Sequence, residues 1–102
     1  MAGPSDMGTL GSFTFSGVVA VGTTSLTILQ DQKRMLYTIT NTSTGGQTIT
    51  LNMGHIAIAN IGIVLSPGQS WVDSNSEGYE CYQGPIQAIA SAAAGQVSIS
   101  AR

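Results

Sequence analysis

Apolar and polar residues alternate along most of this chain, with the period of two that is typical of half-buried β-strands. In residues 12–21, Phe13, Phe15, Val19 and Val21 share one face, while Ser12, Thr14 and Ser16 share the other. At the C-terminal end, Val97, Ile99 and Ala101 alternate with serines. Both segments are rich in β-branched residues, so we predict strands at residues 12–21 and 96–101.

Turn-forming residues divide the middle of the chain into further short segments of the same kind. The segment Asn41–Gly46 is dense in turn formers and joins two alternating segments, so we predict an antiparallel hairpin of residues 34–40 and 47–53. The other predicted strands cover residues 24–29, 56–58, 61–65, 69–73, 79–83 and 86–91.

About eight short strands punctuated by turns predict an all-β fold, a single β-sandwich. The chain has 102 residues, which is enough for one core without disulfides or metals. Trp71 precedes the only cysteine, Cys81, so the Cys…Trp…Cys order of antibody domains is missing. We therefore favour jelly-roll topology over an immunoglobulin-like one.

The first eleven residues break the alternating pattern, and they contain Gly3, Pro4, Gly8 and Gly11. We predict an N-terminal arm at residues 1–11, followed by the sandwich domain at residues 12–102. A neighbouring subunit is expected to hold the arm, for example by strand addition to a sheet edge. The predicted contact residues are Met1, Ala2, Gly3, Pro4, Ser5, Asp6 and Met7.

Charged residues make up 8% of the chain, and the formal net charge is -2. A surface with so few charges is covered by a protein neighbour at little desolvation cost, which favours homo-oligomeric assembly. Lys33, Arg34 and Arg102 are the only basic side chains, so no stripe exists that could neutralise a run of phosphates. We expect no nucleic acid among the partners.

The chain opens without a basic segment followed by an apolar one, and no apolar run approaches the length of a membrane span. We expect a soluble protein made in the cytoplasm, without membrane insertion. With Cys81 as the only cysteine, an internal disulfide is excluded, and either a reducing compartment or a buried thiol is expected.

The sequence offers little for catalysis or for cofactors. His55 is the only histidine, it follows Gly54, and no nucleophile elbow of the form G-x-S-x-G is present. A blue-copper site is excluded because it needs two histidines. We predict an ordinary surface histidine at position 55, no catalytic residue, no metal and no cofactor.

Two features near residue 75 have a chemical interpretation and a structural one. Asp73, Asn75 and Glu77 alternate before a glycine, as in the first half of a calcium loop, but Gly84 stands where a bidentate glutamate is needed. We therefore interpret the segment as a solvated turn.

Trp71, Tyr79 and Tyr82 could stack on a sugar ring or contact a protein partner. The alternative for Trp71 is a buried indole that completes the sandwich core.

Four segments together resemble small structural proteins of tailed and other bacteriophages: Arg34–Ser43, Gly62–Trp71, Tyr82–Ala90 and Gly95–Ile99. The resemblance covers the region from about Arg34 to Arg102. It implies a compact β-sandwich on the virion, used for capsid decoration, for vertex or fibre attachment, or for host contact.

The expected function is that of a non-enzymatic virion component, an auxiliary, decoration or minor capsid protein that stabilises the particle by packing against other capsid subunits. The alternative is a receptor- or carbohydrate-binding module of a phage spike or fibre.

Overall fold

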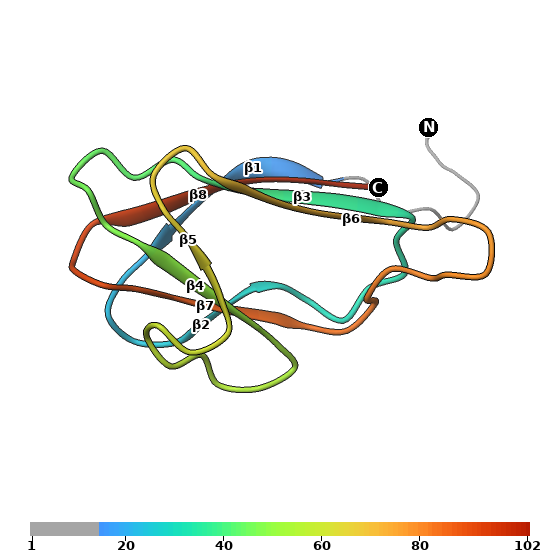
Figure 1. Ribbon diagram of the computed structural model, residues 1–102, viewed down its shortest axis with the longest axis horizontal. Coiled ribbons are helices and arrows are strands. Elements are labelled where there is room, and N and C mark those ends of the chain that lie inside the picture. Colours follow the sequence, from blue (N-terminus) through green and yellow to red (C-terminus); the bar gives the residue numbers. More distant parts are fainter. Residues whose placement is uncertain (1–14) are drawn as a thin grey trace.

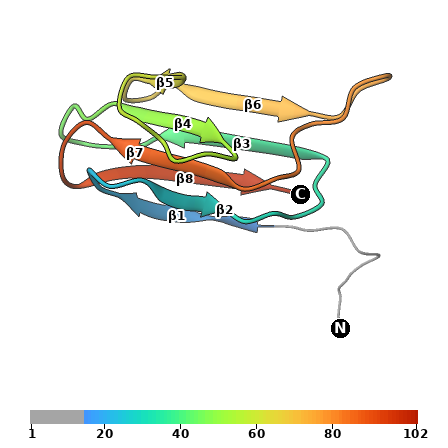
Figure 2. The same cartoon turned by 90° about the horizontal axis from the view of Figure 1, so that it is seen from below.

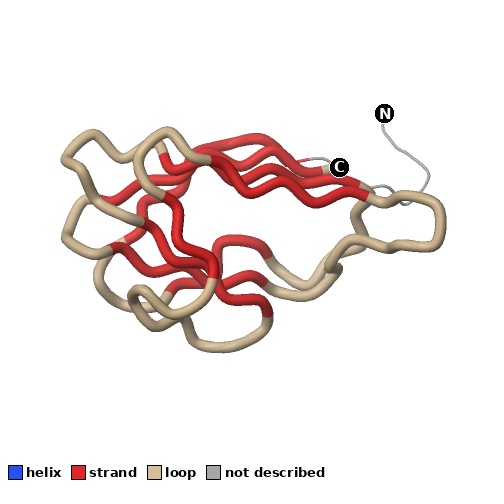
Figure 3. The backbone as a smooth tube through the Cα atoms, in the orientation of Figure 1, coloured by secondary structure: helices blue, strands red, loops and turns tan. Residues whose placement is uncertain are grey.

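The computed structural model describes residues 15–102, which lie in strands, turns and loops (Figure 3). The predicted arm at residues 1–11, with all seven of its predicted contact residues, lies outside this range. Within residues 15–102 there is no helix, and hence none that could cross a membrane. The strands in this range are β1 (Phe15–Val21), β2 (Leu26–Leu29), β3 (Leu36–Asn41), β4 (Ile49–Met53), β5 (Ile63–Leu65), β6 (Ser70–Ser74), β7 (Ile86–Ala90) and β8 (Gly95–Ala101).

The strands form two four-stranded antiparallel sheets, ordered β1-β8-β3-β6 and β2-β7-β4-β5. Figure 1 shows the first sheet above the second, and Figure 2 shows both from below. The first strand pairs with the last, β2 with β7, β3 with β6 and β4 with β5. The predicted all-β, sandwich-like fold is confirmed.

The core lies between the sheets, where alternate side chains of each strand meet. In β8 the predicted inward face is confirmed, because Val97, Ile99 and Ala101 are each at most 2% exposed. Strands β4 and β7 of the opposite sheet also contribute buried apolar residues. The buried core residues are Val21, Ile28, Leu29, Tyr37, Ile39, Ile49, Leu51, Leu65, Cys81, Ile86, Ala88, Ala90, Val97, Ile99 and Ala101.

The predicted hairpin of residues 34–40 and 47–53 is wrong, because β3 and β4 belong to different sheets. The buried Asn41, at the end of β3, stabilises the connection between them. Its side-chain Nδ2 donates to the carbonyl of Gln47 at 2.9 Å and to that of Leu65 at 2.8 Å. Turn formers predict that the chain reverses direction, but they do not determine whether it returns to the same sheet.

The predicted strand at residues 79–83 is also absent. In this segment, side chains accept the main-chain hydrogen bonds that a neighbouring strand would accept in a sheet. The main-chain N–H of Cys81 donates to Asn75 Oδ1 at 2.8 Å, and that of Tyr82 donates to Asp73 Oδ2 at 3.1 Å. Because these partners are side chains, this part of the β6–β7 connection is an ordered loop.

Candidate functional site

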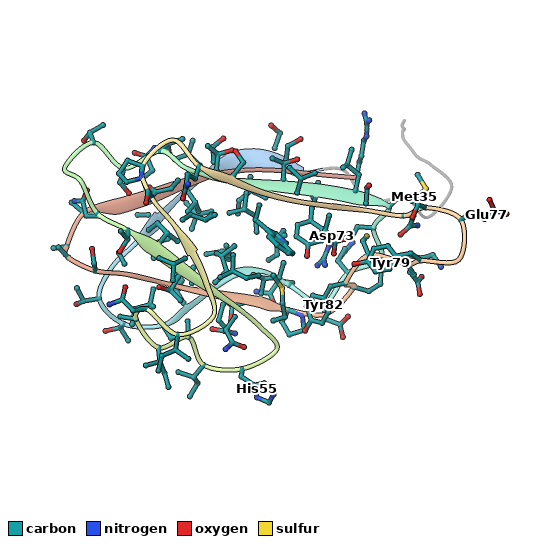
Figure 4. The ribbon with its side chains drawn as sticks, in the orientation of Figure 1. Met35, His55, Asp73, Glu77, Tyr79 and Tyr82 are labelled. Carbon is teal, nitrogen blue, oxygen red and sulfur yellow. The ribbon has the colours of Figure 1, made fainter. Side chains whose placement is uncertain are left out.

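Every charged side chain within residues 15–102 lies at one end of the sandwich. Main-chain hydrogen bonds join the segments there: Asn75 N donates to Met35 O at 2.8 Å, and Gln32 N donates to Gln83 O at 3.0 Å. Figure 4 shows Met35, Asp73 and Glu77 at this end. We call it the charged end, and its charged residues are Asp31, Lys33, Arg34, Asp73, Glu77, Glu80 and Arg102.

The remaining described surface has no formally charged side chain, since none occurs between Phe15 and Gln30, between Met35 and Val72 or between Gln83 and Ala101. The outer face of the β1-β8-β3-β6 sheet shows this most clearly. Strand register aligns its outward side chains in two rows of uncharged, mostly small residues. The rows are Ser16–Ser100–Thr38–Val72 and Val18–Ser98–Thr40–Ser70.

The most apolar part of this neutral surface is the loop of residues 54–62, which we call the isoleucine loop. Strands predicted at residues 56–58 and 61–65 are corrected here: the first is absent, and the second is reduced to β5. Ile56, Ile58 and Ile61 are 74%, 57% and 61% exposed. Three large apolar side chains are thus exposed on one loop outside the β2-β7-β4-β5 sheet.

Main-chain hydrogen bonds and one buried side chain anchor the isoleucine loop. Ala57 is buried, and its N–H donates to Ser25 Oγ at 2.9 Å. The N–H of Asn60 donates to Thr50 Oγ1 at 3.0 Å, so the loop lies over β4 and buries Thr50. An anchored loop loses little conformational entropy when a partner covers its isoleucines.

Asp73 organises an aromatic cluster at the charged end (Figure 4). Its carboxylate accepts hydrogen bonds from the hydroxyl of Tyr79 at 2.8 Å, the hydroxyl of Tyr37 at 3.1 Å and the main-chain N–H of Tyr82. Desolvation alone would raise the pKa of Asp73, but the bonds from Tyr79, Tyr82 and Tyr37 outweigh it and hold the pKa below its ordinary value. Burial raises the pKa of Tyr37 to about 12, so its hydroxyl stays protonated.

Arg34 is 2% exposed, and its guanidinium binds main-chain carbonyls. Nη1 donates to Tyr82 O at 2.6 Å, while Nη2 donates to Gln30 O at 2.7 Å and to Gly84 O at 3.2 Å. The charge also lies 5.3 Å from the centroid of the Tyr37 ring. Arg34 therefore joins the β2–β3 and β6–β7 connections.

Cys81 is a free thiol next to this arginine. It is buried, which was one of the two alternatives predicted from the sequence, the other being a reducing compartment. Its Sγ donates to the carbonyl of Arg34 at 3.4 Å. Burial raises the pKa of the thiol, so the reactive thiolate is disfavoured at neutral pH.

The three aromatic residues predicted as a contact site lie in the same region, but they do not present one platform. Trp71 packs against the core, and its Nε1 donates to the Tyr37 hydroxyl at 3.3 Å. Tyr82 is half-buried and also packs against the core, whereas Tyr79 is 53% exposed. Tyr79 is thus the residue of the three with the most accessible ring.

The other predicted features also have definite places. His55 is exposed on the isoleucine loop and projects away from the sandwich (Figure 4). Asp73 and Asn75 of the calcium-like segment accept hydrogen bonds from the protein itself. Among the described side chains, no three of His, Cys, Asp or Glu are placed to hold a metal ion.

No protein family, curated protein or solved structure matches this chain. A proposal for its function therefore rests on the charged end, the neutral surface and the isoleucine loop.

Sequence reasoning did not identify the roles of Arg34 and Asp73. Both residues bind main-chain groups that are distant in the sequence or lie on an irregular loop, and no local motif marks such contacts. The isoleucine loop had one available signal, because Ile56, Ile58 and Ile61 are three large apolar residues within six positions that contain no charge.

Proposed function

We propose that this protein is a non-enzymatic structural component of a virus particle, and that it stabilises the particle by packing against other capsid subunits. The observation that carries the proposal is the segregation of charge. An isolated domain gains solubility from charges spread over its surface. Within residues 15–102, the outer faces of both sheets and one end lack charged side chains, so neighbours can cover them without desolvating an ion.

The isoleucine loop supports the same proposal. Exposure of three isoleucines to water is unfavourable for an isolated protein, whereas their burial against a neighbour would contribute binding free energy in an assembly. The resemblance of the segments between Arg34 and Arg102 to small bacteriophage structural proteins agrees with a place on a virion.

We also infer that the sandwich is a jelly roll. The support is the strand pairing: β1 pairs with β8, β2 with β7, β3 with β6 and β4 with β5. This arrangement results when one long antiparallel ribbon is rolled up. Consecutive strands alternate between the sheets, except β4 and β5. An immunoglobulin-like sandwich places its first two strands in one sheet.

The test compares a charge placed on the isoleucine loop with one placed at the charged end. Ile58→Lys is expected to weaken binding to purified particles at least about tenfold, since it puts an ion into the contact. Gln32→Lys adds the same charge at an exposed position of the charged end and is expected to leave association unchanged.

A wild-type protein that stays monomeric at about 1 mM and does not bind particles would overturn the proposal. Glycan binding that is lost on Tyr79→Ala, without a change in folding, would favour the carbohydrate-binding alternative. Deletion of Met1–Gly11 tests the predicted arm separately, and we expect a chain that still folds but no longer enters particles.

A further inference from the structure

The two sheets have four edge strands within the described range, and three of them carry features that discourage pairing with another chain. Strand β2 has four residues and an irregular register between Thr27 and Leu29. Strand β5 has three residues. Strand β6 carries Asp73, a charged side chain on its inward face.

Strand β1 has none of these features. It runs for seven residues, Phe15–Val21, without a charge, a proline or a break in its register with β8. A long, regular, uncharged edge is a template for strand pairing. No other strand in the described range pairs with its outer side.

The register identifies the main-chain groups at this open edge. Leu36 and Arg102 exchange two hydrogen bonds, and Thr42 N donates to Gln96 O, so the even-numbered residues of β8 bond to β3. The odd-numbered residues of β8 therefore bond to the odd-numbered residues of β1. It follows that the N–H and C=O groups of Ser16, Val18 and Ala20 point to the open edge.

We propose that β1 pairs with β1 of a second copy, antiparallel and about a two-fold axis, which joins two four-stranded sheets into one continuous sheet. The symmetric register places Val18 opposite Val18, and Ser16 opposite Ala20. Each such pair exchanges two hydrogen bonds.

A second copy is the occupant that this edge fits best. An antiparallel strand is complementary to itself about a two-fold axis, which is the commonest symmetry of homo-oligomers. Because the strand has no charge, two copies meet without repulsion. This inference rests on the proposed function, since it names the contact through which the chain would assemble.

The first test uses two valines that lie on the same outer face. Val18 on β1 is 61% exposed, and Val72 on the opposite edge strand β6 is 56% exposed. Val18→Lys and Val18→Pro are expected to raise the dissociation constant of the full-length dimer roughly 100-fold, measured by sedimentation velocity. Val72→Lys is the matched control and is expected to leave the dimer intact.

Cross-linking is a second test, in which the expected result is a new covalent product. It therefore does not depend on a substitution that could also destabilise β1. Directly opposed residues of a hydrogen-bonded pair have Cα atoms about 5.5 Å apart, within the range of a disulfide. Val18→Cys is expected to form a covalent dimer under mild oxidation, whereas Val72→Cys is expected to stay monomeric under denaturing electrophoresis. The native Cys81 is buried and does not compete.

The outcomes separate this inference from the proposed function. A wild-type protein that assembles while Val18→Lys assembles equally well overturns the β1 contact alone. The same holds if Val72→Cys cross-links and Val18→Cys does not, or if only deletion of residues 1–11 abolishes the dimer. A wild-type protein that remains monomeric and does not bind particles overturns both.

Discussion

Removal of the Arg34 side chain should destabilise the folded chain more than removal of any exposed charge. The guanidinium donates to the carbonyls of Tyr82, Gln30 and Gly84 at 2.6, 2.7 and 3.2 Å. A hydrogen bond from a charged donor contributes about 1.5–3 kcal/mol, and a carbonyl left buried without a donor has a further cost. Desolvation of the charge offsets part of this. We expect Arg34→Ala to lower the free energy of unfolding by roughly 3–5 kcal/mol.

Urea denaturation followed by tryptophan fluorescence and circular dichroism measures this loss directly. For a domain of about 100 residues, 1 kcal/mol corresponds to about 4–8 °C in Tm, so the variant should melt roughly 15–30 °C lower. Lys33→Ala is the matched control, because Lys33 is the exposed neighbour, and it should change stability by less than about 0.5 kcal/mol. If Arg34→Ala lies within about 1 kcal/mol of wild type, the guanidinium does not hold the two connections together.

Three further predictions concern other parts of the described fold. Asp73→Asn should cost about 1–2 kcal/mol at pH 7. Because the folded-state pKa of Asp73 is below its ordinary 3.8, its contribution is present above about pH 4 and is lost as pH falls through the folded-state pKa; the variant should flatten acid denaturation curves in that window. Gly95→Ala should cost about 1–3 kcal/mol in calorimetry, since its Cβ would lie 2.6 Å from Ala90 Cβ and 2.7 Å from Val21 O. Cys81 should react with a thiol reagent only after urea is added, and a fast reaction of the native protein would contradict its burial.

The sequence predicted the strands well where alternation depends on one buried face. Val97, Ile99 and Ala101 lie in the core as expected, because a one-residue shift would expose all three. Strand pairing was harder to predict from the sequence. The turn formers of residues 41–46 indicated a hairpin, whereas the buried amide of Asn41 connects two different sheets.

The cluster around Asp73 could not be predicted for a related reason. Trp71 and Asp73 share one face of β6, and this was visible from their spacing. Their partner Tyr37 is distant in the sequence, and only the pairing of β3 with β6 brings it to them. Local patterns determine which face a side chain occupies, and tertiary structure determines what it meets there.

Sedimentation velocity of the full-length wild-type chain, measured from about 1 μM to 1 mM protein at low and high salt, tests the central claim most directly. Contacts made through the neutral surface predict oligomers that persist, or strengthen, between about 0.05 and 1 M NaCl, because no ion pair is available to screen. A monomer at every concentration that also fails to bind purified particles would contradict the account. So would an oligomer that dissociates in salt, since that result would place the contact at the charged end.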